Sequence, residues 1–129
     1  MVATTTAVMV QTVQTEEATK VMTELERYVR EYFKDIPLLA EISRCESRFR
    51  QFGDNGLVLR GRVNDKDVGI MQINLDYHGE DSYRLGYNVF ELNGNLGYAL
   101  WLYSHYGDDP WIHSKNCWGP YKELLSKQS

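Results

Sequence analysis

Long apolar runs, an excess of positive charge and closely spaced cysteines are all missing from this 129-residue sequence. Its apolar stretches are too short to cross a bilayer, and residues 1–15 lack the basic and continuously apolar regions of a signal peptide. We therefore expect neither a membrane span nor an export signal within the chain. Lys and Arg total 14 against 18 for Asp and Glu, a formal net charge of -4, which argues against a nucleic-acid partner.

Metal-binding patterns are also missing. Cys45 and Cys117 lack the close spacing of zinc motifs, and His78, His105 and His113 are scattered, so we interpret the histidines as ordinary surface or hydrogen-bonding residues. No metal and no cofactor are expected. The cysteines are either two buried free thiols or a single disulfide, which would close most of the domain into one loop and stabilise it by about 4 kcal/mol.

The composition is that of an ordinary globular protein with one core. Hydrophobic residues make up 43% of the chain and charged residues 25%, which is enough apolar material for a single domain of this length. Residues 1–14 are rich in Thr and Val without a clear period, so we predict a flexible arm there. The single domain is then expected to span residues 15–129.

An amphipathic helix is predicted first, over residues 15–34. Thr15 can cap it, two glutamates follow in its first turn, and apolar residues recur at helical spacing. These apolar positions are Met22, Leu25, Val29, Tyr32 and Phe33.

Three more helices follow from the same reasoning. Pro37 suits the first turn of a second helix, and a strong helical period predicts a third over residues 90–106, stopped by Gly107. Gly94 and Gly97 within that third helix are expected to permit close packing. A last short helix is predicted over residues 121–127.

The region between the second and third helices is rich in turn formers. Residues 57–63 alternate enough to be a short strand of a small hairpin, whereas residues 68–74 form either a buried strand or an extended core segment. Residues 78–84 are a polar stretch. The predicted fold class is therefore mainly α (α+β), with a small β-hairpin.

Glu46 stands out by its position on the second predicted helix. Leu38, Ile42, Cys45 and Phe49 follow the spacing i, i+4, i+7 and i+11 and form the stripe that faces the core. Glu46 lies at the edge of this stripe, so its carboxyl is partly desolvated. Desolvation raises the pKa of a carboxyl group, and a raised pKa is what a general acid needs near neutral pH.

Two short motifs in order resemble a known family. Residues 45–49 (CESRF) and residues 69–74 (GIMQIN) resemble the signatures of the soluble lytic transglycosylase domain of the lysozyme-like superfamily, and the resemblance covers residues 37–118. It implies a mainly helical, lysozyme-like fold with the hairpin beside the catalytic helix. Glu46 matches the catalytic glutamate, and Ser47 matches the neighbouring serine.

The resemblance also implies a substrate and a reaction. Lytic transglycosylases cleave the β-1,4 bond between N-acetylmuramic acid and N-acetylglucosamine in peptidoglycan glycan strands. One glutamate acts as acid and then as base, and the muramic acid closes into a 1,6-anhydro product without water. The protein is then expected to work outside the cytoplasm, in the periplasm, in the cell wall or as a secreted enzyme.

Residues 67–74 also resemble the corresponding stretch of animal-type lysozymes, which hydrolyse the same bond with two carboxylates. This likeness would make Asp67 the second catalytic carboxylate of a hydrolytic muramidase. Asp67 is equally interpretable as a turn residue, a common use of Asp. A third hypothesis is a non-catalytic cell-wall-binding module, although such a module need not keep a carboxyl on an apolar stripe.

Several further residues are candidates for contact with the sugars. Gln72 lies in an apolar run and needs hydrogen-bond partners. The resemblance implies that its amide meets a sugar N-acetyl group or orients Glu46, and the alternative is that it caps a backbone group in the core. The aromatic candidates are equally interpretable as core residues. The substrate-binding candidates are Ser47, Met71, Gln72, Asn74, Tyr98, Tyr103 and Trp111.

The end of the chain departs from the better-known branches of the family. They carry a Tyr-Asn pair after the long helix, whereas this chain has WIHSKNCW at residues 111–118. A late cysteine beside an aromatic residue, together with the Cys-Glu-Ser start, resembles the resuscitation-promoting factors. That likeness implies a disulfide between Cys45 and Cys117 that helps to fix Glu46 in place.

Overall fold

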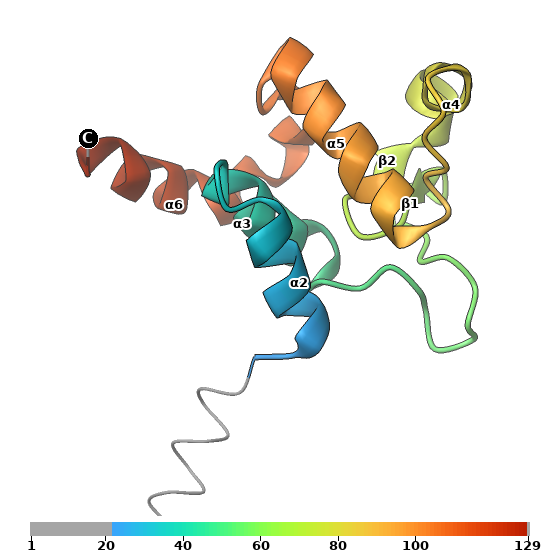
Figure 1. Cartoon of the computed structure of the whole chain (residues 1–129), viewed down its shortest axis with the longest axis horizontal. Helices are drawn as coiled ribbons and strands as arrows, with labels where there is room; N and C mark the ends of the chain where they lie inside the picture. Colours follow the sequence, from blue (N-terminus) through green and yellow to red (C-terminus); the bar gives the residue numbers. More distant parts are fainter. Residues whose placement is uncertain (1–21, 129) are drawn as a thin grey trace, which may run out of the picture.

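The computed structural model describes residues 22–128, which are mostly helical with a two-stranded antiparallel sheet (Figure 1). This confirms the mainly α (α+β) prediction. The predicted arm at residues 1–14 and the predicted cap Thr15 lie outside the described residues. The elements are α2 (Glu24–Tyr32), α3 (Pro37–Ser47), β1 (Asp67–Val68), β2 (Ile73–Asn74), α4 (Leu75–Arg84), α5 (Leu92–Tyr106), the 3-10 helix η1 (Asp109–Ser114) and α6 (Lys115–Lys127).

Helix α3 lies at the centre of the helical part and contacts α2, η1 and α6 (Figure 1). It begins at Pro37, as predicted, because proline needs no hydrogen-bond partner in a first turn. It ends where Arg48 adopts the left-handed conformation. No helix in the described part of the chain is long and apolar enough to span a membrane. The largest fully buried side chains of the core are Trp111, Trp118, Tyr98, Phe33, Leu39, Ile42, Ile70, Met71, Ile73, Leu96 and Leu102.

Helix α5 confirms the predicted long helix and its glycine stop. Gly107 follows it at a φ of 63°, a conformation that glycine adopts without steric cost. Gly94 fits directly against the backbone of Asn88, whose carbonyl oxygen would lie 1.9 Å from a Cβ atom at this position. The two glycines in this helix therefore permit close packing, as expected.

Two helix boundaries differ from the predictions, and one helix was not predicted. Helix α2 begins only at Glu24, with the Thr23 hydroxyl accepting the Glu26 N–H at 3.0 Å, so Met22 precedes the helix. The last helix is longer than predicted and starts at Lys115. Helix α4 was not predicted, because its sequence is too polar to show an apolar stripe, although Asn74 caps its first turn.

The predicted strand at residues 57–63 is wrong. Leu57 and Val63 are exposed to 67% and 103%, so this stretch has no buried face that would hold an alternating strand in register. The described residues of this stretch pair only through isolated bridges.

The hairpin lies further along the chain, where β1 pairs with β2. Between these strands the chain reverses through left-handed conformations at Gly69 (φ 76°) and Gln72 (φ 51°). Residues 68–74 are therefore a tight hairpin and not the single strand or extended segment that was predicted, because these two residues bend the apolar run.

Candidate active site

Glu46 lies in the last turn of α3 with its side chain only 4% exposed. Leu38 and Ile42, on the same helix, are buried in the core. The helical spacing thus placed the carboxyl correctly at the edge of the apolar stripe. Its low exposure removes much of the water that would stabilise a negative charge.

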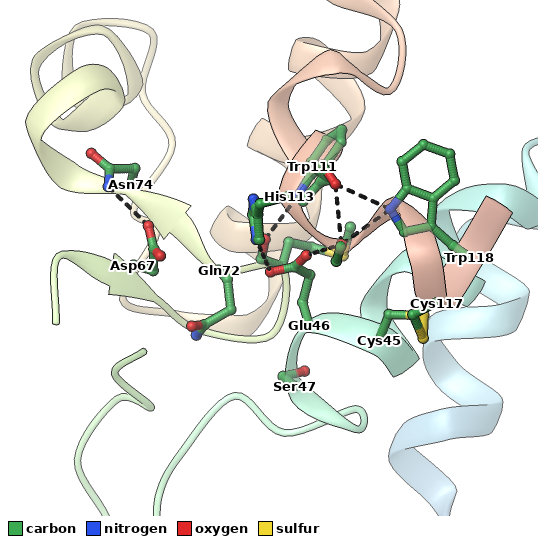
Figure 2. Close-up of polar contacts among 12 residues, drawn as sticks. Cys45, Glu46, Ser47, Asp67, Gln72, Asn74, Trp111, His113, Cys117 and Trp118 are labelled. Atoms are coloured by element: carbon green, nitrogen blue, oxygen red, sulfur yellow. Dashed lines mark hydrogen bonds and ion pairs between the residues drawn. A yellow bond between two sulfur atoms is a disulfide. The ribbon is translucent and has the colours of Figure 1, made fainter. Parts of the chain in front are cut away.

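One oxygen of this carboxyl faces a hydrogen-bond chain from the protein interior (Figure 2). The Ser114 hydroxyl donates to Glu46 Oε2 at 2.5 Å, a shorter distance than the 3.1 Å to its other acceptor, the Trp111 carbonyl oxygen. The buried Trp118 indole N–H donates to the Ser114 oxygen at 3.0 Å. Because an indole only donates, Ser114 accepts from it and directs its own proton to Glu46.

The other carboxyl oxygen faces a histidine. His113 Nε2 lies 3.1 Å from Glu46 Oε1, and the imidazole side chain is 57% exposed. Figure 2 shows the His113 ring and the Glu46 carboxyl pointing toward each other. Glu46 is therefore held between an interior hydroxyl and an exposed imidazole.

These surroundings act on the pKa of Glu46 in opposite directions. Burial is the largest influence and raises it, so that the net pKa lies above the ordinary value. The Ser114 hydrogen bond and the charge and hydrogen bond of His113 lower it, and the negative charge of Asp67 raises it slightly. The carboxyl is thus suited to hold a proton, and its two partners are placed to stabilise the ion that remains after proton transfer.

A disulfide anchors this arrangement. Cys45 precedes Glu46 on α3 and is bonded to Cys117 on α6, with their Cα atoms 5.9 Å apart. The pairing implied by the resuscitation-promoting factors is confirmed. Cys117 follows Ser114 by three residues, so the bond keeps the Ser114 turn next to Glu46.

Two cavities share Gln72 in their lining. The first, of about 560 Å3, is called the arginine cavity and is lined by Glu46, Gln72, Arg48, Arg50, Arg60 and Arg62. The second, of about 600 Å3, is lined by Gln72, Asp67, Asn74, Trp111, His113 and others. Gln72 Nε2 donates to the Gly69 carbonyl at 2.9 Å, so the amide is partly tied to its own turn. Glu46 lines the first cavity and His113 the second.

Two buried amides hold the Gln72 turn in place. The Gln51 side chain accepts the Ile70 N–H at 2.9 Å, and the Asn95 side chain accepts the Met71 N–H at 2.8 Å and donates to the Val68 carbonyl at 3.0 Å. These bonds satisfy the backbone of a segment that is otherwise apolar. Sequence reasoning missed both amides, because each lies far from the turn along the chain.

Glycine is required at position 69 for a steric reason as well as for its φ of 76°. A Cβ atom there would lie 2.3 Å from Asn95 Nδ2 and 2.8 Å from Gln51 Oε1. Only glycine at this position therefore lets both amides reach the backbone of the turn.

Asp67 lies on the side of Gln72 away from Glu46 in the view of Figure 2. It pairs with Asn74 across the hairpin, and its Oδ1 accepts the Asn74 amide N–H at 2.9 Å. Asn74 also caps α4 by accepting the Tyr77 N–H at 3.1 Å. Asp67 faces the second cavity, so Glu46 and Asp67 line different hollows that share Gln72.

The remaining sequence candidates are mostly internal. Ser47 donates to the Ile70 carbonyl at 2.7 Å and helps to hold the hairpin against α3. Met71 and Tyr98 are 0% exposed and present no surface to a ligand in this conformation. Trp111 is 1% exposed and donates its indole N–H to the Met71 carbonyl at 2.9 Å, and Tyr103 packs against the core from α5.

Sequence reasoning missed Ser114 as a partner of Glu46 and treated His113 as an ordinary residue. One available signal was the expected pairing of Cys45 with Cys117. A disulfide beside Glu46 brings the turn before Cys117 next to the carboxyl, and Ser114 is the hydroxyl in that turn.

Within residues 22–128, no group of three or more His, Cys, Asp or Glu side chains is arranged to hold a metal ion. The buried Glu46 carboxyl, with a hydroxyl and an imidazole beside it, can carry out proton transfer. No protein-family model, curated protein or solved structure matches the chain.

Proposed function

We propose that this chain is a lysozyme-like lytic transglycosylase, which cleaves the β-1,4 bond between N-acetylmuramic acid and N-acetylglucosamine in peptidoglycan. The observation that carries the proposal is the setting of Glu46, a carboxyl that is 4% exposed, has a raised pKa and lies on a cavity wall. The motifs around it, CESRF and GIMQIN, resemble those of the family, and they meet at this wall.

The proposed reaction uses Glu46 twice. Protonated Glu46 gives its proton to the glycosidic oxygen, the bond from that oxygen to C1 breaks, and positive charge develops at C1. The Glu46 carboxylate then accepts the proton of the muramic acid 6-hydroxyl, whose oxygen bonds to C1. The product is a 1,6-anhydro sugar, and no water is consumed.

Ser114 and His113 support the second half of this cycle. Both groups favour the ionised form of Glu46, which is the form that exists between the two proton transfers. A donor fixed before the reaction needs no reorganisation when the charge forms. Ser114 and His113 therefore stabilise the Glu46 carboxylate and not the protonated acid of the resting enzyme.

We place this activity outside the cytoplasm. The disulfide between Cys45 and Cys117 is compatible with an extracytoplasmic protein, because disulfides persist mainly in oxidising compartments. The periplasm, the cell wall and the secreted state all meet this condition.

The direct test is digestion of purified peptidoglycan followed by mass analysis of the released fragments. We expect 1,6-anhydro ends from the wild type and no release from Glu46→Gln, which keeps the size of the side chain but has no acidic proton to transfer. Glu41→Gln is the matched control, because Glu41 is the other buried glutamate of α3 and has no place on the cavity wall. Turnover that persists in Glu46→Gln would refute the proposal.

A hydrolytic muramidase is the second candidate, and Asp67 is the reason to keep it. Its charge influences the pKa of Glu46, and it lines the neighbouring cavity. In that case the fragments would carry reducing ends, and Asp67→Asn would lose most of the activity. Transglycosylation predicts little loss, since Asp67 then only holds Asn74.

The third candidate, a cell-wall-binding module without turnover, is separated by the same digestion. It predicts that the wild type retains sedimentation with insoluble peptidoglycan but releases no fragments. Release of any product by the wild type excludes it.

A further inference from the structure

The arginine cavity gathers four positive charges beside Glu46. Arg48 and Arg50 come from the turn that follows α3, and Arg60 and Arg62 come from the loop before β1. Glu46 is the only acidic residue among its lining residues. In a chain with 18 acidic and 14 basic side chains, this local excess is not explained by overall composition.

None of these four guanidinium groups forms an ion pair with a carboxylate within residues 22–128. Arg50 Nε donates to the Ser47 carbonyl and Arg60 Nη1 to the Asp65 carbonyl, both at 3.2 Å, so these contacts leave the positive charge uncompensated. Elsewhere the pattern differs. Arg30, Arg44 and Arg84 each pair with a carboxylate on their own helix.

The backbone that carries these arginines is unusually shaped. Arg48 and Phe49 have φ values of 55° and 61°, a left-handed conformation that costs roughly 1–2 kcal/mol for a residue with a side chain. The turn that brings Arg48 and Arg50 to one cavity is therefore maintained against a local penalty. Such penalties persist where the surrounding structure imposes them, often at binding sites.

Gly61 lets the second pair of arginines lie directly against the site wall. A Cβ atom at this position would lie 2.4 Å from the Asn64 carbonyl oxygen and 3.0 Å from Gln72 Oε1. Only a residue without a side chain allows this approach. Arg60 and Arg62, the two neighbours of Gly61, line the same cavity as Gln72.

We infer that the arginine cavity is an anion subsite that binds the carboxylates of the peptide stem on the muramic acid being cleaved; this inference rests on the proposed function. The stem is attached to that sugar through a lactyl group, so a sugar placed at Glu46 carries its carboxylates close to the catalytic acid. Guanidinium groups bind carboxylates with paired, charge-assisted hydrogen bonds. Arginines that are not paired with a carboxylate can bind such a ligand without first breaking an ion pair.

The test compares two glycan strands that differ only in charge: one with free stem carboxylates and one with these groups amidated. For the wild type we expect a KM about tenfold lower on the free form, a size typical of charge-assisted hydrogen bonds at a partly exposed site. The double variant Arg60→Gln/Arg62→Gln should raise KM on the free form about tenfold, leave KM on the amidated form unchanged and change kcat little.

Arg27→Gln is the matched control, because Arg27 is an exposed arginine on α2 that also lacks a carboxylate partner among the described residues. Arg27→Gln should leave KM unchanged on the free and on the amidated strand. Thermal unfolding should show that all variants fold. Equal KM values of the wild type on both strands would overturn the inference. So would a loss in the double variant that is the same on both strands, since the arginines would then bind another part of the ligand.

Failure of the proposed function is distinguished by a binding measurement. If the wild type cleaves neither strand, the proposed function fails, and the two strands are titrated against Glu46→Gln by calorimetry. Tighter binding of the free form, lost in Arg60→Gln/Arg62→Gln on this background, supports the subsite. Equal binding of both forms overturns it.

Discussion

The two sides of Glu46 are built by different means. On the helix side, formed by α3, η1 and α6, a disulfide and a chain of hydrogen bonds through Trp118 and Ser114 reach the carboxyl. On the loop side, residues 51–74 are shaped by two buried amides and by glycines at positions 61 and 69. The helix side contacts the carboxyl itself, whereas the loop side supplies half of the residues that line each cavity.

The difference shows that the groups that set the protonation of Glu46 are distinct from the groups that shape the ligand cavity. Groups that change the pKa of Glu46 come mainly from the helix side, namely Ser114 and His113, whereas the arginines and Gln72 come from the loop side or its junction with α3. Changes on the helix side should therefore move the pH dependence of activity. Changes on the loop side should move KM or the stability of the hairpin.

Removing the disulfide should have the largest effect. Cys45→Ala/Cys117→Ala opens a loop with a sequence separation of 72, and we expect a loss of about 4 kcal/mol in the free energy of unfolding. Activity should fall with it, because Ser114 and His113 are no longer tied next to Glu46. Urea unfolding measures the first effect. An unchanged unfolding midpoint would contradict the assigned role of the bond.

Gly69→Ala should destabilise the loop side by about 3 kcal/mol, because it combines an unfavourable φ with a clash against both buried amides. Gly86→Ala is the matched control. Gly86 has a φ of 86° with no atom within 4 Å of its Cβ position, so it isolates the conformational cost of about 1 kcal/mol. Similar losses in thermal unfolding for both variants would show that the amide contacts are unimportant.

Ser114→Ala should lower kcat about tenfold or more, since hydrogen bonds to charged groups contribute roughly 1.5–3 kcal/mol. The hydroxyl lowers the pKa of Glu46, so its removal raises that pKa further. Activity requires the protonated acid, and the pH above which kcat falls should therefore move upward. Ser114→Thr keeps the hydroxyl and should restore both values. If kcat of Ser114→Ala fell by the same factor at every pH, with no shift of the profile along the pH axis, Ser114 would have a structural role only.

Glu46→Gln should change how stability depends on pH. Burial raises the pKa of folded Glu46 above its unfolded value, so its protonated form contributes stability below the unfolded pKa, and this contribution is lost as pH rises through the folded pKa. Glutamine does not titrate. The wild type should therefore lose stability relative to the variant as pH rises from the ordinary glutamate range through the raised pKa of folded Glu46. Parallel stability curves across this range would contradict the burial of an ionisable carboxyl.

His113→Gln should have the smallest effect, because the imidazole is 57% exposed and solvent screens its interaction with Glu46. Loss of that charge raises the pKa of Glu46, so the alkaline limb of the activity profile should move slightly upward. We expect less than about a threefold change in kcat at pH 6, consistent with an exposed pair. A loss as large as that of Ser114→Ala would mean that His113 takes part in proton transfer directly.

The sequence predicted the elements whose signals are local. The apolar period and Pro37 predicted α3, the period before Gly107 predicted α5, and both helices were found. The polar helix α4 and the position of the hairpin were not predicted. The helix depends on a local cap at Asn74 and the hairpin on burial against distant parts of the chain, and neither leaves an apolar period in the sequence.

For the candidate site, the sequence by itself determined Glu46 on the edge of a buried stripe, because helical spacing fixes which residues share a face. Only the tertiary structure decided that Ser114 and His113 reach its two oxygens, 68 and 67 residues away along the chain. It also decided that four arginines with no carboxylate partners within residues 22–128 share one cavity with Glu46. Such groupings arise from chain reversals at left-handed residues and from a long-range disulfide, and neither is encoded in local periodicity.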